Sequence, residues 1–201
     1  MKRLTLPAVL ALLSAVCIGA SAQEKISLNG KWNLEFWEQE DTPVTDPSQV
    51  ALLNTTKLSA TVPGNVELDL MAAGMIDDPS VGNNIYKLRP YEFCQWMYSR
   101  HFTAPSLSKG QRLILDFEGI DCLADIWLNG ERIGSTDNAM IAHKFDVSKA
   151  VQPGDNLLQV ILRSAFLEAQ NYLVTATAGT SCPGWSVPDC GGMFTLRSRT
   201  P

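Results

Sequence analysis

The sequence predicts an all-β protein, a β-sandwich whose short helices are confined to the connections between strands. The first observation is a hairpin pattern: apolar and polar residues alternate over 124–128, Asn129-Gly130 follows, and 131–134 is again extended. Asn and Gly both adopt positive φ at low cost, as the type I′ turn of a two-residue hairpin requires. The second observation is that at least seven short alternating segments recur along the chain at intervals typical of a sandwich.

The alternating segments, taken in chain order, define the expected strands. They span residues 26–36, 58–62, 96–102, 112–117, 124–128, 131–134, 145–148 and 157–163. In the first of them Trp32, Leu34 and Phe36 share one face, because successive side chains of a strand alternate between its two faces. We expect that face to lie in a core shared by two sheets.

One connection carries the signals of a short helix. Asn65 is the expected N-cap of a helix over 66–73, and Gly74 stands where that helix should end. Glu67 and Asp69 fall in the first turn, where the positive end of the helix dipole favours acidic side chains. We expect this helix to lie on the sandwich.

The remaining connections are predicted from turn formers. Residues 38–49 and 76–89 are polar and carry prolines, so both are expected to be surface loops. Residues 166–173 form a second helical candidate, and 174–192 is rich in small residues, glycine and proline, hence a loop. Long ordered loops often carry binding residues, which makes 76–89 the first place to look for a site.

The N-terminus has the pattern of a secretory signal peptide. Two basic residues precede an apolar stretch over 4–18 and the small-residue cleavage motif Ala20-Ser21-Ala22. We therefore expect residues 1–22 to be removed and the mature protein to be periplasmic or secreted, with no membrane partner. A membrane anchor is disfavoured because the stretch is shorter than the roughly 20 residues of a spanning helix. Lipidation at Cys17 is disfavoured because valine precedes it, where a bacterial lipobox has a smaller residue.

The charge balance argues against nucleic acid as a partner. The formal net charge is −5 over 201 residues, and no basic run interrupts the sequence. Proteins that bind nucleic acid usually carry a basic patch or stripe, so this class of partner is not expected.

Four cysteines would remain after cleavage of the signal peptide: Cys94, Cys122, Cys182 and Cys190. Cys182 and Cys190 bracket a short loop and are the best-placed disulfide pair in an oxidising compartment. The alternative, in which all four are reduced and buried, stays open because a chain of this length does not need staples. The two histidines do not lie at ligand spacing from a cysteine, so neither a metal site nor a cofactor is expected.

An ordered series of motifs resembles the N-terminal sugar-binding-like domain of glycoside hydrolase family 2, a galactose-binding-domain-like jelly roll, and particularly its β-mannosidase branch. The series comprises Ser27-Leu28-Asn29-Gly30-Lys31-Trp32, Val62-Pro63-Gly64-Asn65-Val66, Asp69-Leu70, Gly74-Met75-Ile76-Asp77-Asp78-Pro79, Gly82-Asn83-Asn84, Trp96-Met97-Tyr98, Phe117-Glu118-Gly119-Ile120-Asp121, Ala124-Asp125-Ile126-Trp127-Leu128-Asn129-Gly130, Asp137-Asn138-Ala139-Met140 and Pro153-Gly154-Asp155-Asn156. Each motif is weak singly. Their common order along nearly the whole mature chain makes the resemblance strong.

The resemblance implies a retaining glycosidase whose two catalytic carboxyls lie outside this chain. In the family both are glutamates on a downstream (β/α)₈ barrel, one acting as acid and the other as nucleophile. A barrel needs roughly 250 residues, so the sandwich leaves no room for one here. We therefore expect residues 23–173 to form the sandwich and 174–201 to form a C-terminal loop and the start of the next segment, ahead of Ig-like and barrel domains. This chain alone is expected to be inactive.

The resemblance also implies where substrate contacts would lie. Asn84, with Asn83 beside it, matches a family asparagine on the long loop that leans toward the barrel mouth, and Asp137-Asn138 forms a second loop expected to face the barrel. Independently of the resemblance, Trp185 lies outside a clear strand and is the best aromatic candidate for contacting a glycan or the downstream domains. Arg197 could orient sugar hydroxyls or a downstream aspartate from a strand face. The structural alternative for the two loops is that Asn and Asp close turns through local side-chain hydrogen bonds.

Three functional hypotheses follow. The first is the non-catalytic N-terminal domain of an exported β-mannosidase-like enzyme, whose ligand is a β-linked mannoside or another oligosaccharide. The second is a carbohydrate-binding module that acts alone. The third is the same domain in another family 2 enzyme, such as a β-glucosaminidase or β-galactosidase, because the sandwich motifs recur across those branches.

Overall fold

The computed structural model describes residues 24–171, which form two antiparallel sheets with four short helices in their connections. The strands are β1 (Gly30–Glu38), β2 (Thr56–Val62), β3 (Cys94–Ala104), β4 (Ile114–Phe117), β5 (Ala124–Leu128), β6 (Glu131–Thr136), β7 (His143–Asp146) and β8 (Gly154–Leu162). The helices are α1 (Pro47–Val50), α2 (Val66–Ala72), the 3₁₀ helix η1 (Asn84–Phe93) and α3 (Ala165–Ala169). The predicted all-β class is confirmed.

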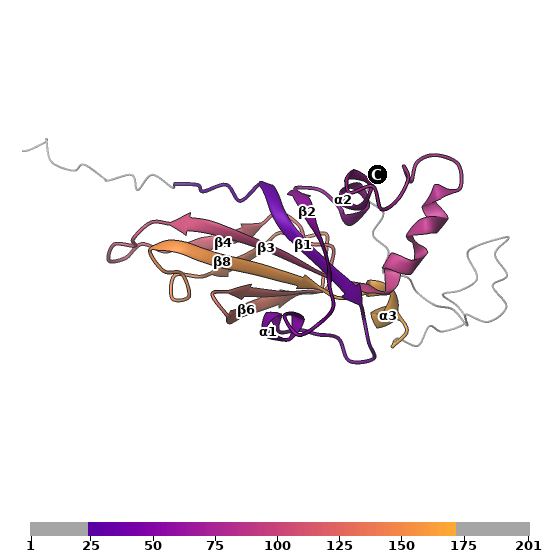
Figure 1. The fold of residues 1–201 in the computed structure, drawn as a ribbon. Coiled ribbons are helices and arrows are strands. Elements are labelled where there is room, and N and C mark those ends of the chain that lie inside the picture. The colour runs from indigo at the N-terminus through magenta and orange to yellow at the C-terminus, as the bar shows by residue number, and fades with distance from the viewer. Residues whose placement is uncertain (1–23, 172–201) are drawn as a thin grey trace, which may run out of the picture.

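The larger sheet has six strands in the order β2-β1-β3-β8-β5-β6, and the smaller pairs β4 with β7 (Figure 1). Every pairing is antiparallel. The Asn129-Gly130 hairpin joins the neighbouring strands β5 and β6, whereas β3 and β8 pair across about fifty residues of intervening chain. Register in the large sheet is set by apolar positions on the face that meets the small sheet, since a slip of one residue would turn them to the other face.

The main core lies between the two sheets. Trp32, Leu34 and Phe36 share one buried face of β1, as the alternation predicted. They pack in one cluster with Ala124, Ile126 and Leu128 of β5, Leu158 and Val160 of β8, Trp96 of β3 and Leu115 of β4. The cluster spans both sheets, so removal of this apolar surface from water stabilises the sandwich as one unit.

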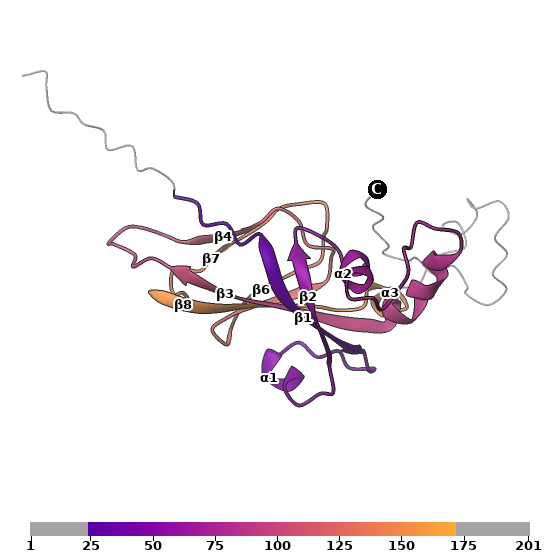
Figure 2. The ribbon, with the colours of Figure 1, turned by 45° about the horizontal axis from the view of Figure 1, so that its top comes forward.

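The opposite face of the large sheet is covered by the segment that carries α1. Figure 2 shows β4 and β7 on one side of the six-stranded sheet and α1 on the other. Trp37, Met97 and Ile161 form a second small cluster with Val50 of α1 and Val44 of the preceding loop. Residues 38–49, predicted to be a surface loop, therefore include part of a short helix and close a second core.

The hairpin has the geometry predicted for its turn. Asn129 has φ +53° and Gly130 has φ +82°, and the register pairs Leu128 with Glu131 across them. A register shift between Ile126 and Trp127 marks a bulge in this ladder. Both turn residues thus occupy the left-handed region that asparagine and glycine tolerate best.

The structure differs from the sequence prediction mainly in residues 76–89. They were expected to form a loop, but their second half belongs to η1, which extends to Phe93 and contains Pro90. The predicted helix over 66–73 is present as α2, and that over 166–173 as the shorter α3. In residues 24–171 no helix is long and apolar enough to cross a membrane.

Several predictions lie outside the described residues. They are the signal peptide over 1–22, the Cys182–Cys190 disulfide, the site residues Trp185 and Arg197, and the segment 174–201. The other two cysteines are described: Cys94 and Cys122 are both free and buried. Burial is the main reason that the pKa of each thiol is raised, to about 11 for Cys94, so both are protonated at neutral pH.

Candidate functional site

The fold brings the two predicted site loops to the same end of the six-stranded sheet. The register places Trp96, Leu162, Ala124 and Thr136 in a row across β3, β8, β5 and β6. Since η1 leads directly into β3 and the loop over 137–142 directly follows β6, both connections emerge at this end. Three strand spacings separate β3 from β6, or about 14 Å. Both loops could therefore border one ligand or one neighbouring domain without contacting each other.

Asn84 is held by its own loop. Its Nδ2 donates to the carbonyl oxygen of Asp78 at 3.0 Å, and its backbone N–H donates to the carbonyl of Val81 at 3.1 Å. The Asp78 carboxylate in turn accepts from the N–H and the hydroxyl of Ser80. These bonds favour the structural alternative for Asn84, in which the side chain closes a turn, and they fix the point at which η1 begins.

Asn83 is the freer of the two neighbouring asparagines. It is exposed, occupies the N-cap position of η1, and makes no side-chain capping hydrogen bond. An amide side chain carries both donors and acceptors, as recognition of a sugar hydroxyl requires. In the described part of the chain Asn83 is therefore better placed than Asn84 to contact a ligand, which reverses the order of preference drawn from the resemblance.

The loop after β6 divides in the same way. The Asn138 side chain accepts from the N–H of Met140 at 2.8 Å, and the Asn138 carbonyl lies 2.7 Å from Nε2 of His143. Asn138 is thus a turn former. Asp137 is exposed and its side chain makes no hydrogen bond among residues 24–171, so its carboxylate is available to a partner.

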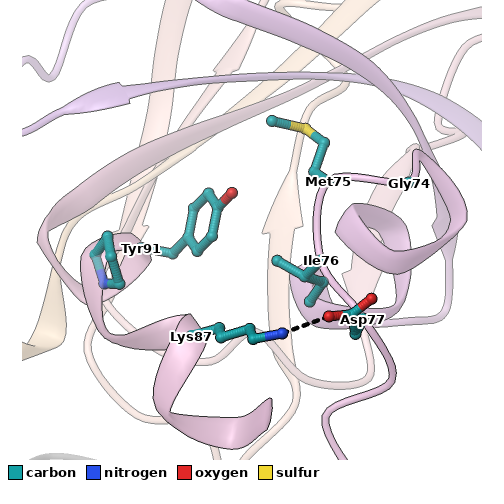
Figure 3. A pocket seen from close by; sticks show the side chains of 7 residues that line it. Gly74, Met75, Ile76, Asp77, Lys87 and Tyr91 are labelled. Atoms are coloured by element: carbon teal, nitrogen blue, oxygen red, sulfur yellow. Dashed lines mark hydrogen bonds and ion pairs between the residues drawn. The ribbon is translucent and has the colours of Figure 1, made fainter.

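A pocket of about 350 Å³ opens beside η1, and the sequence did not indicate it. Its lining comes from the turn after α2 and from η1 (Figure 3), and comprises Gly74, Met75, Ile76, Asp77, Lys87, Pro90 and Tyr91. Lys87 and Asp77 form an ion pair across it. Tyr91 also lines a smaller pocket of about 120 Å³ on the side toward Leu70 and Leu88.

The charges at this end are held in place by local contacts. Hydrogen bonds from the Ser80 hydroxyl and N–H lower the pKa of the Asp78 carboxyl, so it is ionised at neutral pH. Asp77 pairs with Lys87 ten residues later, and both side chains stay largely exposed. No local pattern indicates this pair, because only the folding of η1 back toward the end of α2 brings the two residues together.

The pocket is anchored to the core by Tyr91. Its ring packs edge-on against Phe36 at 5.7 Å and lies 6.2 Å from Trp96. On the other wall Met75 donates its backbone N–H to Leu70 at the end of α2. The pocket is therefore tied to the core and to α2, even though its residues belong to connections.

No group of three His, Cys, Asp or Glu side chains that could hold a metal ion occurs within residues 24–171. The described residues of this end supply amide, carboxylate, ammonium and phenol groups beside apolar side chains. Such a surface suits hydrogen bonding to hydroxyl-rich ligands and contact with another protein surface, and it does not assemble an acid and a nucleophile for bond cleavage.

Known proteins share this sandwich. A family model described as "Glycosyl hydrolase 2 galactose-binding domain-like" matches residues 32–193. The chain belongs to this family. The match covers most of the sequence, including both site loops, and agrees with the resemblance drawn from the ordered motifs.

The relatives narrow the branch within the family. Beta-mannosidase of Mus musculus is 33% identical over 163 residues, 81% of this chain and 16% of the relative. Beta-mannosidase B of Thermothelomyces thermophilus is 35% identical over 105 residues, 52% of this chain and 12% of the relative. The crystal structure of Beta-D-Mannosidase from Dictyoglomus thermophilum superimposes with a TM-score of 0.58 at 36% identity, covering 76% of this chain and 18% of that one. The chain spans less than a fifth of each relative and corresponds to the non-catalytic N-terminal domain of β-mannosidase-like family members.

Proposed function

We propose that this domain serves an exported β-mannosidase, a retaining hydrolase that removes terminal β-mannosyl residues with a catalytic barrel elsewhere in the protein. The observation that carries the proposal is the identity of 33–36% to β-mannosidases of a mammal and a bacterium over about four-fifths of the chain. The export signal expected over residues 1–22 supports a periplasmic or secreted location.

The end surface that carries the site loops has the character of a contact surface. Nine of the thirteen exposed large apolar residues in the described chain belong to it or to the α2–η1 segment leading into it. They are Leu68, Met71, Met75, Val81, Ile85, Tyr86, Phe93, Met140 and Ile141. Clustered exposed apolar groups mark interaction sites more often than solvated surface. In our proposal this surface braces the downstream domains, and Asn83 and Asp137 reach toward the glycoside from its rim.

Activity of the full-length parent protein tests the proposal. It should release the chromophore of an aryl β-mannoside, and it should hydrolyse the matching β-glucosaminide and β-galactoside much more slowly. Preferential cleavage of either of those two would overturn the mannosidase assignment in favour of another branch of the family. A reading frame that stops at Pro201 with no barrel sequence nearby would instead overturn the domain-of-an-enzyme proposal.

Two substitutions test the proposed role of the rim. Asn83→Ala in the full-length enzyme should raise KM for the aryl β-mannoside, and Asp137→Ala should do the same. Removal of a hydrogen bond to a neutral hydroxyl lowers kcat/KM by about two- to tenfold. Asn33→Ala, at an exposed asparagine within β1, is the matched control and should leave KM and kcat/KM unchanged. Wild-type constants in both rim variants would remove Asn83 and Asp137 from the site.

Binding by the isolated chain distinguishes the remaining hypothesis. A carbohydrate-binding module should bind mannose or a manno-oligosaccharide by titration calorimetry at millimolar sugar. The proposed domain supplies only rim contacts and should show no detectable binding. Saturable binding by the isolated chain would favour the module.

A further inference from the structure

Asparagine followed by glycine is chemically labile, and the chain contains two such pairs, Asn29-Gly30 and Asn129-Gly130. The glycine nitrogen, with no Cβ beside it to hinder approach, attacks the side-chain carbonyl carbon of the asparagine. Ammonia leaves as a five-membered succinimide closes. Water then opens the ring at either carbonyl, giving aspartate or isoaspartate. The reaction requires a side chain that is free to turn toward the following nitrogen.

The Asn129 side chain is not free to turn. Its Nδ2 donates to the carbonyl of Ala150 at 3.0 Å and to Oδ1 of Asn156 at 2.8 Å. Its Oδ1 accepts from the N–H of Leu157 at 2.9 Å. Attack by Gly130 would require these bonds to break together, because the carbonyl carbon and the amide nitrogen move as one planar group.

Asn29 presents the opposite case. It is exposed, precedes β1, and its side chain makes no hydrogen bond among residues 24–171. Only its backbone is held: its N–H donates to Oγ of Ser27 at 3.3 Å, and its carbonyl accepts from Nη1 of Arg100 at 2.9 Å. A guanidinium on that carbonyl stabilises the negative charge that develops on the peptide when the glycine nitrogen loses its proton and attacks.

We propose that Asn29 is the deamidation site of the folded protein and that the fold protects Asn129 from the same reaction. The product would alter a structured turn. Nη1 of Arg100 lies 2.8 Å from the carbonyl of Leu28 and 3.3 Å from that of Lys31, and the guanidinium lies 5.9 Å from the Trp32 ring centroid. Isoaspartate at position 29 would insert a methylene into the main chain within this set of carbonyls.

Incubation of the folded chain at mildly alkaline pH, followed by peptide mass mapping, tests the proposal. Peptides containing residue 29 should acquire the Asn-to-Asp mass change at least about tenfold faster than those containing residue 129, a ratio that corresponds to about 1.4 kcal/mol of activation free energy. Isoaspartate at position 29 should be detectable by methyl transfer from a protein isoaspartyl methyltransferase.

Two controls show whether the fold is responsible. In concentrated urea both dipeptides lose their tertiary contacts, and their rates should converge to within about twofold, since the same two residues react in each. Asn29→Gln should abolish modification at position 29 in the folded chain, because the longer side chain closes the ring far less readily. Equal rates in the folded chain, or faster reaction at Asn129, would overturn the proposal.

Discussion

Single residues show how far a local pattern predicts a role. Asn129 was predicted to form a type I′ turn, and its φ of +53° confirms this. The structure adds that its side chain binds three groups, on Ala150, Asn156 and Leu157, which lie 21 to 28 residues further along the chain. Turn chemistry is encoded locally and is therefore readable, whereas these partners are supplied by the fold.

Substitution of Asn129 should separate its two roles. Asn129→Gly keeps the positive φ and loses the three hydrogen bonds, and should cost about 2 kcal/mol of unfolding free energy. Asn129→Ala should cost about 1 kcal/mol more, because alanine is strained in the left-handed region. Urea denaturation measures both. Equal losses in the two variants would show that backbone conformation contributes nothing at this position.

Asp125 is a buried carboxylate in β5. Its Oδ1 accepts from Arg132 Nη2 at 2.6 Å, and its Oδ2 lies 3.6 Å from Arg163 Nε. The Asp125 side chain is 3% exposed, while that of Arg132 is 50% exposed. The free-energy cost of desolvation is therefore larger for the Asp125 carboxylate than for the Arg132 guanidinium.

Substitution of Asp125 should cost more unfolding free energy than substitution of Arg132. Asp125→Ala leaves a cavity and removes the carboxylate that compensates the charge of Arg163, so it should lower the unfolding free energy by about 3 kcal/mol. Arg132→Gln removes a half-exposed cation and retains a donor, so it should cost about 1 kcal/mol. The two chemical denaturation curves provide the comparison, and a larger loss for the arginine variant would contradict this ranking.

At the scale of elements, α2 illustrates a prediction that was right in place and incomplete in cause. Asn65 caps the helix by accepting from the N–H of Leu68 at 2.9 Å, as expected. Asp69 lies in the first turn, where the dipole favours it, but it is also buried and accepts from the N–H of Thr61 at 3.0 Å. Its carboxylate thus ties α2 to β2, which no local pattern shows.

The burial of Asp69 predicts a pH effect. Desolvation raises the pKa of its carboxyl above the ordinary 3.8, although the Thr61 N–H and the Lys31 charge act in the opposite direction. The folded state therefore binds this proton more tightly than the unfolded state, and the associated stability is present below pH 3.8 and is lost as pH rises through the folded pKa. Asn at position 69 stays neutral throughout.

Asp69→Asn should consequently gain stability relative to the wild type as the pH rises from about 3 to about 7. Parallel urea denaturation of the two proteins at several pH values measures the difference. A difference that is constant over this range, or one that shrinks toward neutral pH, would show that burial does not control the titration of Asp69.

The helix η1 is an element that turn formers concealed. A 3₁₀ run of ten residues is unusually long, and Pro90 within it removes a backbone donor. Its order comes from tertiary contacts: Leu88 is buried, and Tyr91 packs against Phe36 and Trp96. Because local propensity does not specify the element, the pocket it forms with the turn after α2 was not predictable either.

For the whole molecule, the alternation correctly predicted two sheets around one core and left the second core unseen. The covering segment is fixed by side chains of the sheet beneath it. Gln95 binds both the N–H and the carbonyl of Val44 at 2.8 Å, and Trp127 Nε1 donates to the carbonyl of Thr45 at 2.8 Å. Gln95 therefore acts as a substitute for a neighbouring strand.

Removal of this bridge should loosen the cover and leave the main core intact. Gln95→Ala leaves both polar groups of Val44 without partners and should cost about 2 kcal/mol. Amide exchange at Val44 should accelerate. Exchange in β8 should accelerate only as far as the lower global stability accounts for. Unchanged exchange at Val44 would mean that apolar contacts alone hold the segment.

The sequence by itself determined the strands, the hairpin turn, the capped helix and the family, because alternation, positive-φ residues and capping side chains act over a few neighbouring positions. It also selected the two loops that emerge at the same end of the sheet. Only the tertiary structure decided which asparagine of Asn83-Asn84 is free, which turn η1 folds against, and where the pair Asp77–Lys87 closes the pocket. Those outcomes depend on contacts between segments distant in sequence, whose geometry is set by packing on the core and not by the residues beside them.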